Sequence, residues 1–151
     1  MVVGKGLLNP KDAVGSDKLP VHLFPASAIA MGSLAFLNGA LKYGSYNWRH
    51  TGVRVSVYID ALIRHALAYL EGEEVDPDDG VPHEAAMLAC VAILVDAKAA
   101  GKLIDDRAYR GEGVRLLMDT LTPHVARLKA LHQSYSPHHY TILDQGDDNE
   151  T

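Results

Sequence analysis

The sequence of 151 residues contains a single cysteine, Cys90. One cysteine excludes an intramolecular disulfide and a cysteine-rich zinc site, and such sparse use is typical of a reducing compartment. Because Cys90 lies inside the apolar run Ala85–Val95, we expect a buried structural thiol rather than a nucleophile.

The chain also lacks a long apolar run and an excess of positive charge. Its longest apolar stretch, Ala85–Val95, is far shorter than the roughly 20 residues of a membrane helix, and the start of the chain lacks the charged-then-apolar order of a signal peptide. The formal net charge is -5, whereas proteins that bind nucleic acid concentrate lysine and arginine. We therefore expect a cytoplasmic protein with neither a membrane nor a nucleic-acid partner.

Two catalytic signatures are missing as well. The phosphate-binding loop Gly-x-x-x-x-Gly-Lys-Ser/Thr is absent, since Gly4-Lys5-Gly6 has neither the spacing nor the hydroxyl. No histidine is followed by an aspartate, which removes the metal dyad of the HD-type phosphohydrolases.

What the sequence does contain is apolar residues at helical spacing. The chain is 48% hydrophobic, which suffices for the core of one compact domain. We predict helices over residues 25–43, 54–70 and 82–100, each followed by a glycine that ends it. A short helix over Val114–Leu121 and another that restarts at Thr122-Pro123 follow. Val53–Val57 is the best strand candidate, but it leads directly into a helical pattern.

The fold class follows from this periodicity. We predict an all-α protein, a compact bundle of about four to five helices. Residues 1–24 hold prolines, glycines and alternating charges, and we expect an irregular arm there. Residues 25–135 form the predicted helical catalytic domain, and residues 136–151 form a tail that has little to pack and is expected to be mobile.

The loop between the second and third predicted helices carries the densest charge. Glu73, Asp76, Asp79 and His83 follow one another at intervals of three, three and four residues, so a helical turn would bring several of them to one face. Carboxylate oxygens suit Mg²⁺ or Mn²⁺, which bridge substrate phosphates. The structural alternative is that Asp79 caps the third helix, His83 is a core-edge histidine and the acids form a solvated turn.

A second cluster follows the first predicted helix. It gathers aromatic, amide and basic side chains: Lys42, Tyr43, Tyr46, Asn47, Trp48 and Arg49. The rings could stack on a purine, the amide could bond the edge of the base, and the cations could contact phosphates. The alternative makes Trp48 the hydrophobic anchor of a loop.

Arg64 and His65 lie inside the second predicted helix. Asp60 precedes Arg64 by four residues, which favours a structural salt bridge. An arginine on a nearly apolar helix is also placed to reach an internal anionic site. His65, with tyrosines above and below it, is most simply a hydrogen-bonded core residue.

In their order and spacing, these stretches resemble the phage-type dATP/dGTP diphosphohydrolases, which include the MazZ-like proteins and are related to the MazG-like all-α NTP pyrophosphohydrolases. The resemblance covers about residues 9–107 and rests on Asn9–Gly15, Gly39–Gly44, Asn47–Arg49, Tyr58, Ala61, Arg64, His65, Gly72-Glu73, Asp76, Asp79–His83 and Leu103–Arg107.

The resemblance implies a homodimer or homotetramer that binds two or more divalent ions, Mg²⁺ or Mn²⁺, per site. It would cleave purine deoxynucleoside triphosphate, dGTP or alternatively dATP, between the α and β phosphates. In phages whose DNA carries 2-aminoadenine, the dGMP produced feeds synthesis of the modified nucleotide.

The resemblance also assigns residues to roles. Glu73 and Asp76 become catalytic metal ligands, and Asp79 and His83 become ligands or neighbours of ligands. A Glu-x-x-Glu pair of the MazG-like group has no counterpart here, so either Asp60 and His65 complete the shell or a ligand comes from elsewhere. The expected substrate contacts are Lys11, Asp12, Lys42, Tyr43, Asn47, Trp48, Arg49, Arg64, Asp105, Asp106 and Arg107. A different class of function remains open, namely a non-catalytic nucleotide-binding or helical interaction module.

Overall fold

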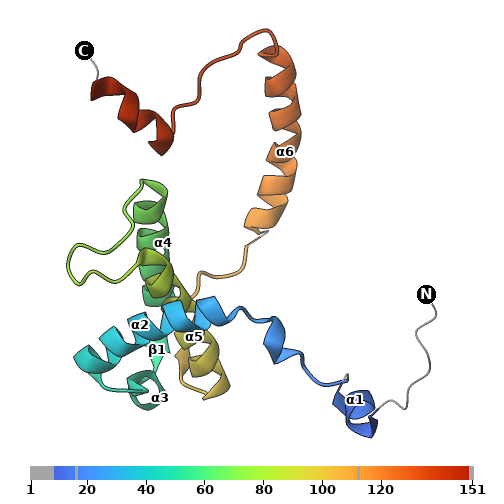
Figure 1. Ribbon diagram of the computed structural model, residues 1–151. Coiled ribbons are helices and arrows are strands. Elements are labelled where there is room, and N and C mark those ends of the chain that lie inside the picture. The colour runs from blue at the N-terminus through green and yellow to red at the C-terminus, as the bar shows by residue number, and fades with distance from the viewer. Residues whose placement is uncertain (1–8, 16, 112, 150–151) are drawn as a thin grey trace. The chain divides into compact units, whose positions relative to one another are not determined.

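A computed structural model describes residues 9–15, 17–111 and 113–149 (Figure 1). Its elements are α1 (Pro10–Gly15), η1 (Val21–Leu23), α2 (Ala26–Tyr43), α3 (Asn47–Thr51), β1 (Val53–Arg54), α4 (Val55–Leu70), α5 (His83–Ala99), β2 (Leu103–Ile104), α6 (Val114–Leu131) and η2 (Ile142–Asn149). The described chain is mostly helical, which confirms the all-α prediction. Its contacts divide it into two compact units, Met1–Ile104 and Asp105–Thr151.

The three long helices of the first unit, α2, α4 and α5, match the three predicted from periodicity. Each is followed by a glycine with a positive φ, a backbone region that other residues rarely adopt: Gly44 at 89°, Gly72 at 91° and Gly101 at 67°. A search of the described helices finds none that is both long and apolar enough to span a membrane.

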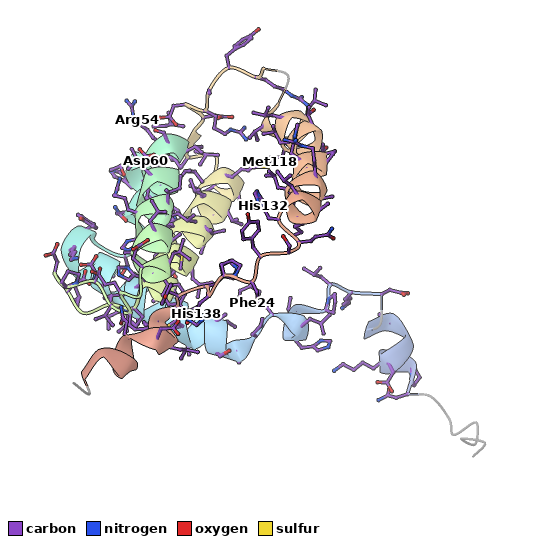
Figure 2. All side chains as sticks on the ribbon, turned by 90° about the horizontal axis from the view of Figure 1, so that it is seen from above. Phe24, Arg54, Asp60, Met118, His132 and His138 are labelled. Carbon is purple, nitrogen blue, oxygen red and sulfur yellow. The ribbon has the colours of Figure 1, made fainter. Side chains whose placement is uncertain are left out.

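Helix α5 is the centre of the first unit, because both α2 and α4 pack against it. Figure 2 shows α4 and α5 side by side. Ala85, Ala89 and Ala97 on α5 are buried, and a Cβ built on Gly32 of α2 would lie 3.6 Å from the Cβ of Leu88. The small side chains of α5 therefore let its neighbours approach closely, as the alanine content predicts.

Two short strands, β1 just before α4 and β2 shortly after α5, pair with each other. Val53 pairs with Leu103 and Arg54 with Ile104 in a parallel two-stranded sheet. Trp48, Val53 and Ala97 form the buried cluster beside it. The sequence marked residues 53–57 as the best strand candidate. Only the first two residues become a strand, because the helical pattern takes over at Val55.

The prediction of an irregular arm over residues 1–24 is wrong for Pro10–Gly15, which forms α1. Asn9 explains this helix. Its carbonyl accepts the N–H of Asp12 at 2.8 Å, and its side-chain oxygen accepts the N–H of Lys11 at 3.0 Å. An asparagine before a proline in the first turn is a helix start signal, and here it outweighs the glycines and prolines of the arm.

In the second unit, the prediction of two helices around Pro123 is also wrong. Helix α6 runs without a break from Val114 to Leu131 with Pro123 inside it. A proline removes one backbone donor and crowds the preceding turn, and here this penalty does not end the helix. The predicted tail contains the 3-10 helix η2. His138, which precedes this helix, has its Nε2 2.9 Å from an oxygen of Asp144.

Candidate functional site

A cavity of about 390 Å³ opens between α2, α4, α5 and the loop over residues 71–82. We call it the acidic cavity. Small residues line much of it, namely Ala35, Gly39, Ala61, Ala86 and Ala89. Its other lining residues are Asn38, Lys42, Tyr43, Tyr58, His65, Asp76, Asp79, Val81 and Cys90. Five residues predicted for the site, Lys42, Tyr43, His65, Asp76 and Asp79, thus share one cavity although they come from three separate segments.

The loop after α4 holds its two inner acids in place by closing on itself. The N–H of Asp76 donates to the carbonyl of Val81 at 2.9 Å, and the N–H of Gly80 donates to the carbonyl of Asp76 at 2.7 Å. Val75 and Pro82 form an antiparallel bridge. These bonds give the loop one defined conformation.

Asp79 connects this loop to α2. One of its oxygens accepts hydrogen bonds from Asn38 at 2.6 Å and from Lys42 at 2.8 Å, and the other accepts the N–H of Val81 at 3.0 Å. The hydrogen bond from Lys42, followed by that from Val81, lowers the pKa of Asp79 to about 2. The prediction that Asp79 caps α5 is wrong, because the residue before α5 is Pro82 and no side chain caps the helix.

Asp76 differs from Asp79 in having an open oxygen. Its Oδ1 accepts the N–H of Asp78 at 2.9 Å. Its Oδ2 has no hydrogen-bond partner in the part of the chain that the structure describes. Asp76 is therefore the less engaged of the two acids that line the cavity.

His83 connects Glu73 to His65. It is 2% exposed, with Nε2 2.9 Å from an oxygen of Glu73 and Nδ1 2.9 Å from Nδ1 of His65. A carboxylate only accepts, so His83 donates from Nε2. A neutral His83 then accepts at Nδ1 and His65 donates to it. Both ring nitrogens of His83 are occupied, and the chain of bonds fixes the ring of His65 at the cavity.

Asp60 lies away from these groups. It does not line the acidic cavity, although Tyr58 and Ala61 on either side of it on α4 do. Figure 2 shows Asp60 near the end of α4 that Arg54 begins. The expected ion pair between Asp60 and Arg64 is absent from the salt bridges of the described residues.

The predicted metal shell of six residues is thus divided among three places. Across the described residues, no three histidine, cysteine, aspartate or glutamate side chains lie close enough to hold one ion. Asp76 and Asp79 remain together at the acidic cavity. Magnesium commonly takes one or two carboxylates and completes its shell with water and substrate phosphates. These two acids fit that arrangement rather than a complete protein cage.

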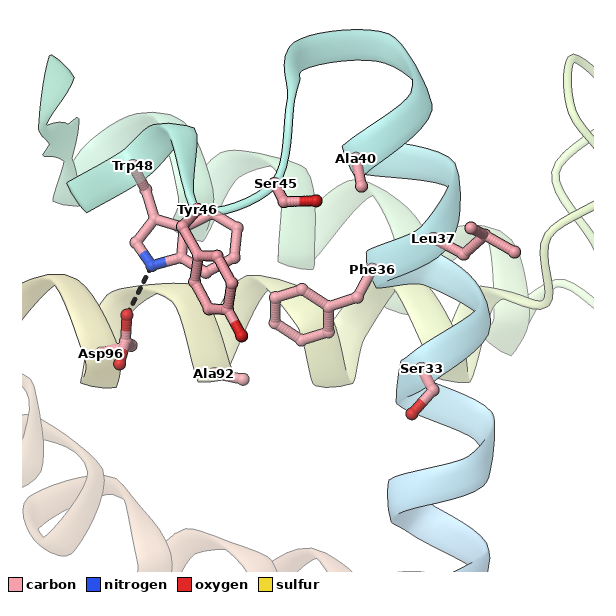
Figure 3. A pocket seen from close by; sticks show the side chains of 9 residues that line it. All are labelled: Ser33, Phe36, Leu37, Ala40, Ser45, Tyr46, Trp48, Ala92 and Asp96. Carbon is pink, nitrogen blue, oxygen red and sulfur yellow. Dashed lines mark hydrogen bonds between the residues drawn. The ribbon is translucent and has the colours of Figure 1, made fainter. Parts of the chain in front are cut away.

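The Trp48 cluster packs elsewhere. Trp48 is 9% exposed, and its Nε1 donates to Asp96 at 2.6 Å. Arg49 binds both oxygens of the same carboxylate at 2.7 Å, and this bond chiefly lowers the pKa of Asp96 to about 2. Trp48 and Asp96 line a different cavity (Figure 3), which we call the aromatic cavity.

Asn38 and Asp96 line the cavities with polar side chains but were not among the predicted site residues. A signal existed for each, because Asn38 is a polar residue inside an apolar helix and Asp96 ends the apolar run of α5. Six other predicted contacts of the first unit do not line the acidic cavity: Lys11, Asp12, Asn47, Trp48, Arg49 and Arg64. The last three, Asp105, Asp106 and Arg107, belong to the second unit. Of these, Arg107 binds Asp105 through two hydrogen bonds of 2.7 and 2.6 Å within the second unit.

Comparison with known proteins gave one match. A family model described as dATP/dGTP diphosphohydrolase, N-terminal, matches residues 8–107. This range contains every residue that lines the acidic cavity, and it ends before α6. No curated protein and no solved structure matched the chain.

Proposed function

Because the chain belongs to the dATP/dGTP diphosphohydrolase family, we propose that its acidic cavity binds a purine deoxynucleoside triphosphate. The products are the monophosphate and pyrophosphate, and the reaction depends on a divalent metal ion. The observation that carries this proposal is the meeting of Asp76, Asp79 and Lys42, from α2 and the acidic loop, at one cavity.

The small residues of the acidic cavity support a nucleoside there. Alanine and glycine residues on α2, α4 and α5 leave an apolar space of about 390 Å³, which is within the range of small-molecule sites. Tyr58 lines the same space, and burial raises the pKa of its hydroxyl. The ring offers a stacking surface for the base, and the hydroxyl stays protonated as a donor.

The polar groups of the cavity suit the triphosphate. Asp76, through its open oxygen, and Asp79 would hold the divalent ion, which when bound supplies positive charge and activates water as a nucleophile. Lys42, whose ammonium lies 2.8 Å from Asp79, offsets phosphate charge. His65, held by His83, orients a water or a phosphate oxygen.

The experiment compares Asp76→Asn with Asp78→Asn, an exposed acid two residues further along that does not line the cavity. Each variant and the wild type are incubated with each dNTP and Mn²⁺ or Mg²⁺, and the products are separated by anion exchange. We expect turnover to fall by more than about 100-fold in Asp76→Asn and to remain near wild type in Asp78→Asn. A loss of that size exceeds the usual effect of replacing a residue that only orients a metal ligand.

Three results would contradict the proposal. Equal turnover in both variants would remove Asp76 from the site. Release of orthophosphate instead of pyrophosphate would exclude cleavage between the α and β phosphates. Nucleotide retained without any product would favour the second candidate, a non-catalytic nucleotide-binding module.

The finer parts of the proposal rest on the resemblance of the motifs. They are a preference for dGTP, with dATP as the alternative, and a role in remodelling a phage nucleotide pool for 2-aminoadenine DNA in the bacterial cytoplasm. Assembly as a homodimer or homotetramer has support of a different kind, because large apolar side chains on α2 and α4 are exposed.

A further inference from the structure

The aromatic cavity, of about 510 Å³, lies on the opposite side of α2 from the acidic cavity. Phe36 and Ala40 line the aromatic cavity, whereas Asn38 and Lys42 line the acidic one. Positions two residues apart on a helix point about 200° apart around its axis. A ligand in the aromatic cavity is therefore separated from the catalytic acids by the body of α2.

Aromatic rings form the walls of this cavity. Figure 3 shows Phe36 projecting from α2 toward Tyr46 and Trp48. The ring centres of Tyr46 and Phe36 each lie 5.5 Å from that of Trp48, and the Arg49 guanidinium lies 5.0 Å from the centre of the Tyr46 ring. Flat rings at such an opening offer stacking surfaces to a planar heterocycle.

The backbone at Tyr46 is strained in a way that places its ring. Tyr46 has φ 57°, the only positive φ at a non-glycine residue in the described chain. Such a conformation is unfavourable for a residue with a Cβ, and it persists where surrounding contacts hold it. Here the guanidinium and the indole hold the ring beside the cavity.

Asp96 gives the cavity a hydrogen-bond acceptor. Its Oδ2 accepts from Trp48 and Arg49, whereas its Oδ1 accepts only from Arg49 among the described residues. A carboxylate oxygen has two acceptor positions, so Oδ1 keeps one for a ligand. The bidentate bond with Arg49 balances the negative charge of Asp96. The site therefore favours an uncharged group with an N–H donor over a phosphate.

We propose that the aromatic cavity is a second ligand site, which binds the ring of an amino-bearing purine nucleoside. The ring stacks on Tyr46 and Phe36, and its amino group donates to Asp96. This second site goes beyond the proposed hydrolysis. It recognises the base, and none of its groups contacts the triphosphate.

Trp48 is the only tryptophan of the chain, so its fluorescence reports directly on this cavity. The full-length protein is titrated without metal with 2′-deoxyadenosine and with the same nucleoside lacking the 6-amino group. We expect saturable quenching by 2′-deoxyadenosine, and affinity at least about tenfold weaker for the second compound, because it lacks the hydrogen bond to a charged group. Equal affinity for the two, or no saturable change with either, would overturn the proposal.

Two matched variants on α5 assign the signal to one cavity. Ala92→Leu fills the aromatic cavity, and Ala86→Leu adds the same side chain to the acidic one. With both folds checked by circular dichroism, we expect Ala92→Leu to abolish quenching and Ala86→Leu to retain it. The reverse pattern would place the nucleoside in the acidic cavity and overturn the proposal. If Ala92→Leu does not fold, the comparison of the two nucleosides decides.

The test separates this inference from the proposed function. Asp76→Asn should lose hydrolysis and keep the quenching. If the nucleoside quenches Trp48 in a wild type that hydrolyses no dNTP, the proposed function is contradicted and the second site is still supported. Trp48 emission could instead change with protein concentration and stay the same when nucleoside is added. This result would show that a second copy of the chain fills the cavity, and it would also overturn the proposal.

Discussion

At the scale of single residues, Asp96 joins two elements of the first unit. It lies on α5 and accepts hydrogen bonds from Trp48 and Arg49 on α3. Trp48 thereby has its polar edge satisfied while its ring packs against Phe36. A tryptophan can be buried at low cost only when its N–H finds such a partner. The position of α3 therefore depends on one carboxylate.

Replacing this carboxylate should destabilise the protein in a pH-dependent manner. The amide of Asp96→Asn lacks the charge that binds Arg49, so we expect a lower urea midpoint than in the wild type at neutral pH. The pKa of Asp96 in the folded protein, about 2, lies below its ordinary value of 3.8. The native state thus binds this proton more weakly than the unfolded chain, and the stabilisation is complete above pH 3.8 and is lost as the pH falls through about 2.

The measurement is urea unfolding of both proteins from neutral pH to about pH 3, followed by Trp48 fluorescence. The gap between the two midpoints should narrow as the pH decreases. A gap that stays constant over this range would show that the ionised carboxylate contributes nothing to stability.

At the scale of elements, the pairing of β1 with β2 depends on a glycine. Gly52 precedes β1 with φ 79°, and a Cβ at this position would lie 2.9 Å from the carbonyl oxygen of Lys102. That carbonyl accepts the N–H of Val53 at 3.1 Å. A side chain at residue 52 would push the two strands apart next to the buried Val53.

Gly52→Ala should therefore cost more than the positive φ alone. Gly44→Ala is the control, since Gly44 has φ 89° but nothing within 4 Å of its Cβ position. We expect a loss in the free energy of unfolding of about 3 kcal/mol for Gly52→Ala and about 1 to 2 kcal/mol for Gly44→Ala. Both are measured by urea denaturation, and equal losses would mean that the contact with Lys102 relaxes freely.

Helix α6 offers a second test at this scale. Pro123→Ala restores the backbone donor facing the carbonyl of Asp119 and removes the crowding of the ring. The gain is partly offset by a more flexible unfolded chain, which leaves a net stabilisation of about 2 kcal/mol. Thermal unfolding followed by circular dichroism should show stronger helical signal and a higher midpoint. A lower midpoint would show that the proline is needed by the packing of α6.

At the scale of the whole molecule, the long helices leave apolar surface uncovered. Ile63, Leu67 and Leu70 follow one another at helical spacing on α4 and are 47, 57 and 78% exposed. Exposed apolar surface of this kind marks an interface when it is continuous. It supports the proposed assembly of identical chains.

Sedimentation of the wild type should accordingly give the mass of two or four chains of 16.3 kDa. Leu67→Glu places a charge in the stripe and should shift the protein toward a single chain. Lys98→Glu, an exposed change of charge on α5, is the control and should keep the wild-type mass. A wild type that sediments as one chain would refute the assembly.

The three long helices of the first unit and their ends were predictable from the sequence alone. Apolar periodicity and a glycine that accepts positive φ are local properties, and they hold wherever the helix finally packs. The same local reasoning missed α1, where the start signal was the short pair Asn9-Pro10. It also predicted two helices where the structure has the single helix α6, because the penalty of Pro123 does not end that helix.

Which polar groups meet depends on the packing of the helices and could not be predicted from the sequence. Asp79 binds Lys42 on α2 rather than capping α5, His83 binds His65 on α4, and Trp48 faces Asp96 across the unit rather than the acidic loop. Spacing along a chain shows which side chains share a face of one helix. The partner of each face depends on how α2 and α4 pack against α5, and that is a property of the assembled core.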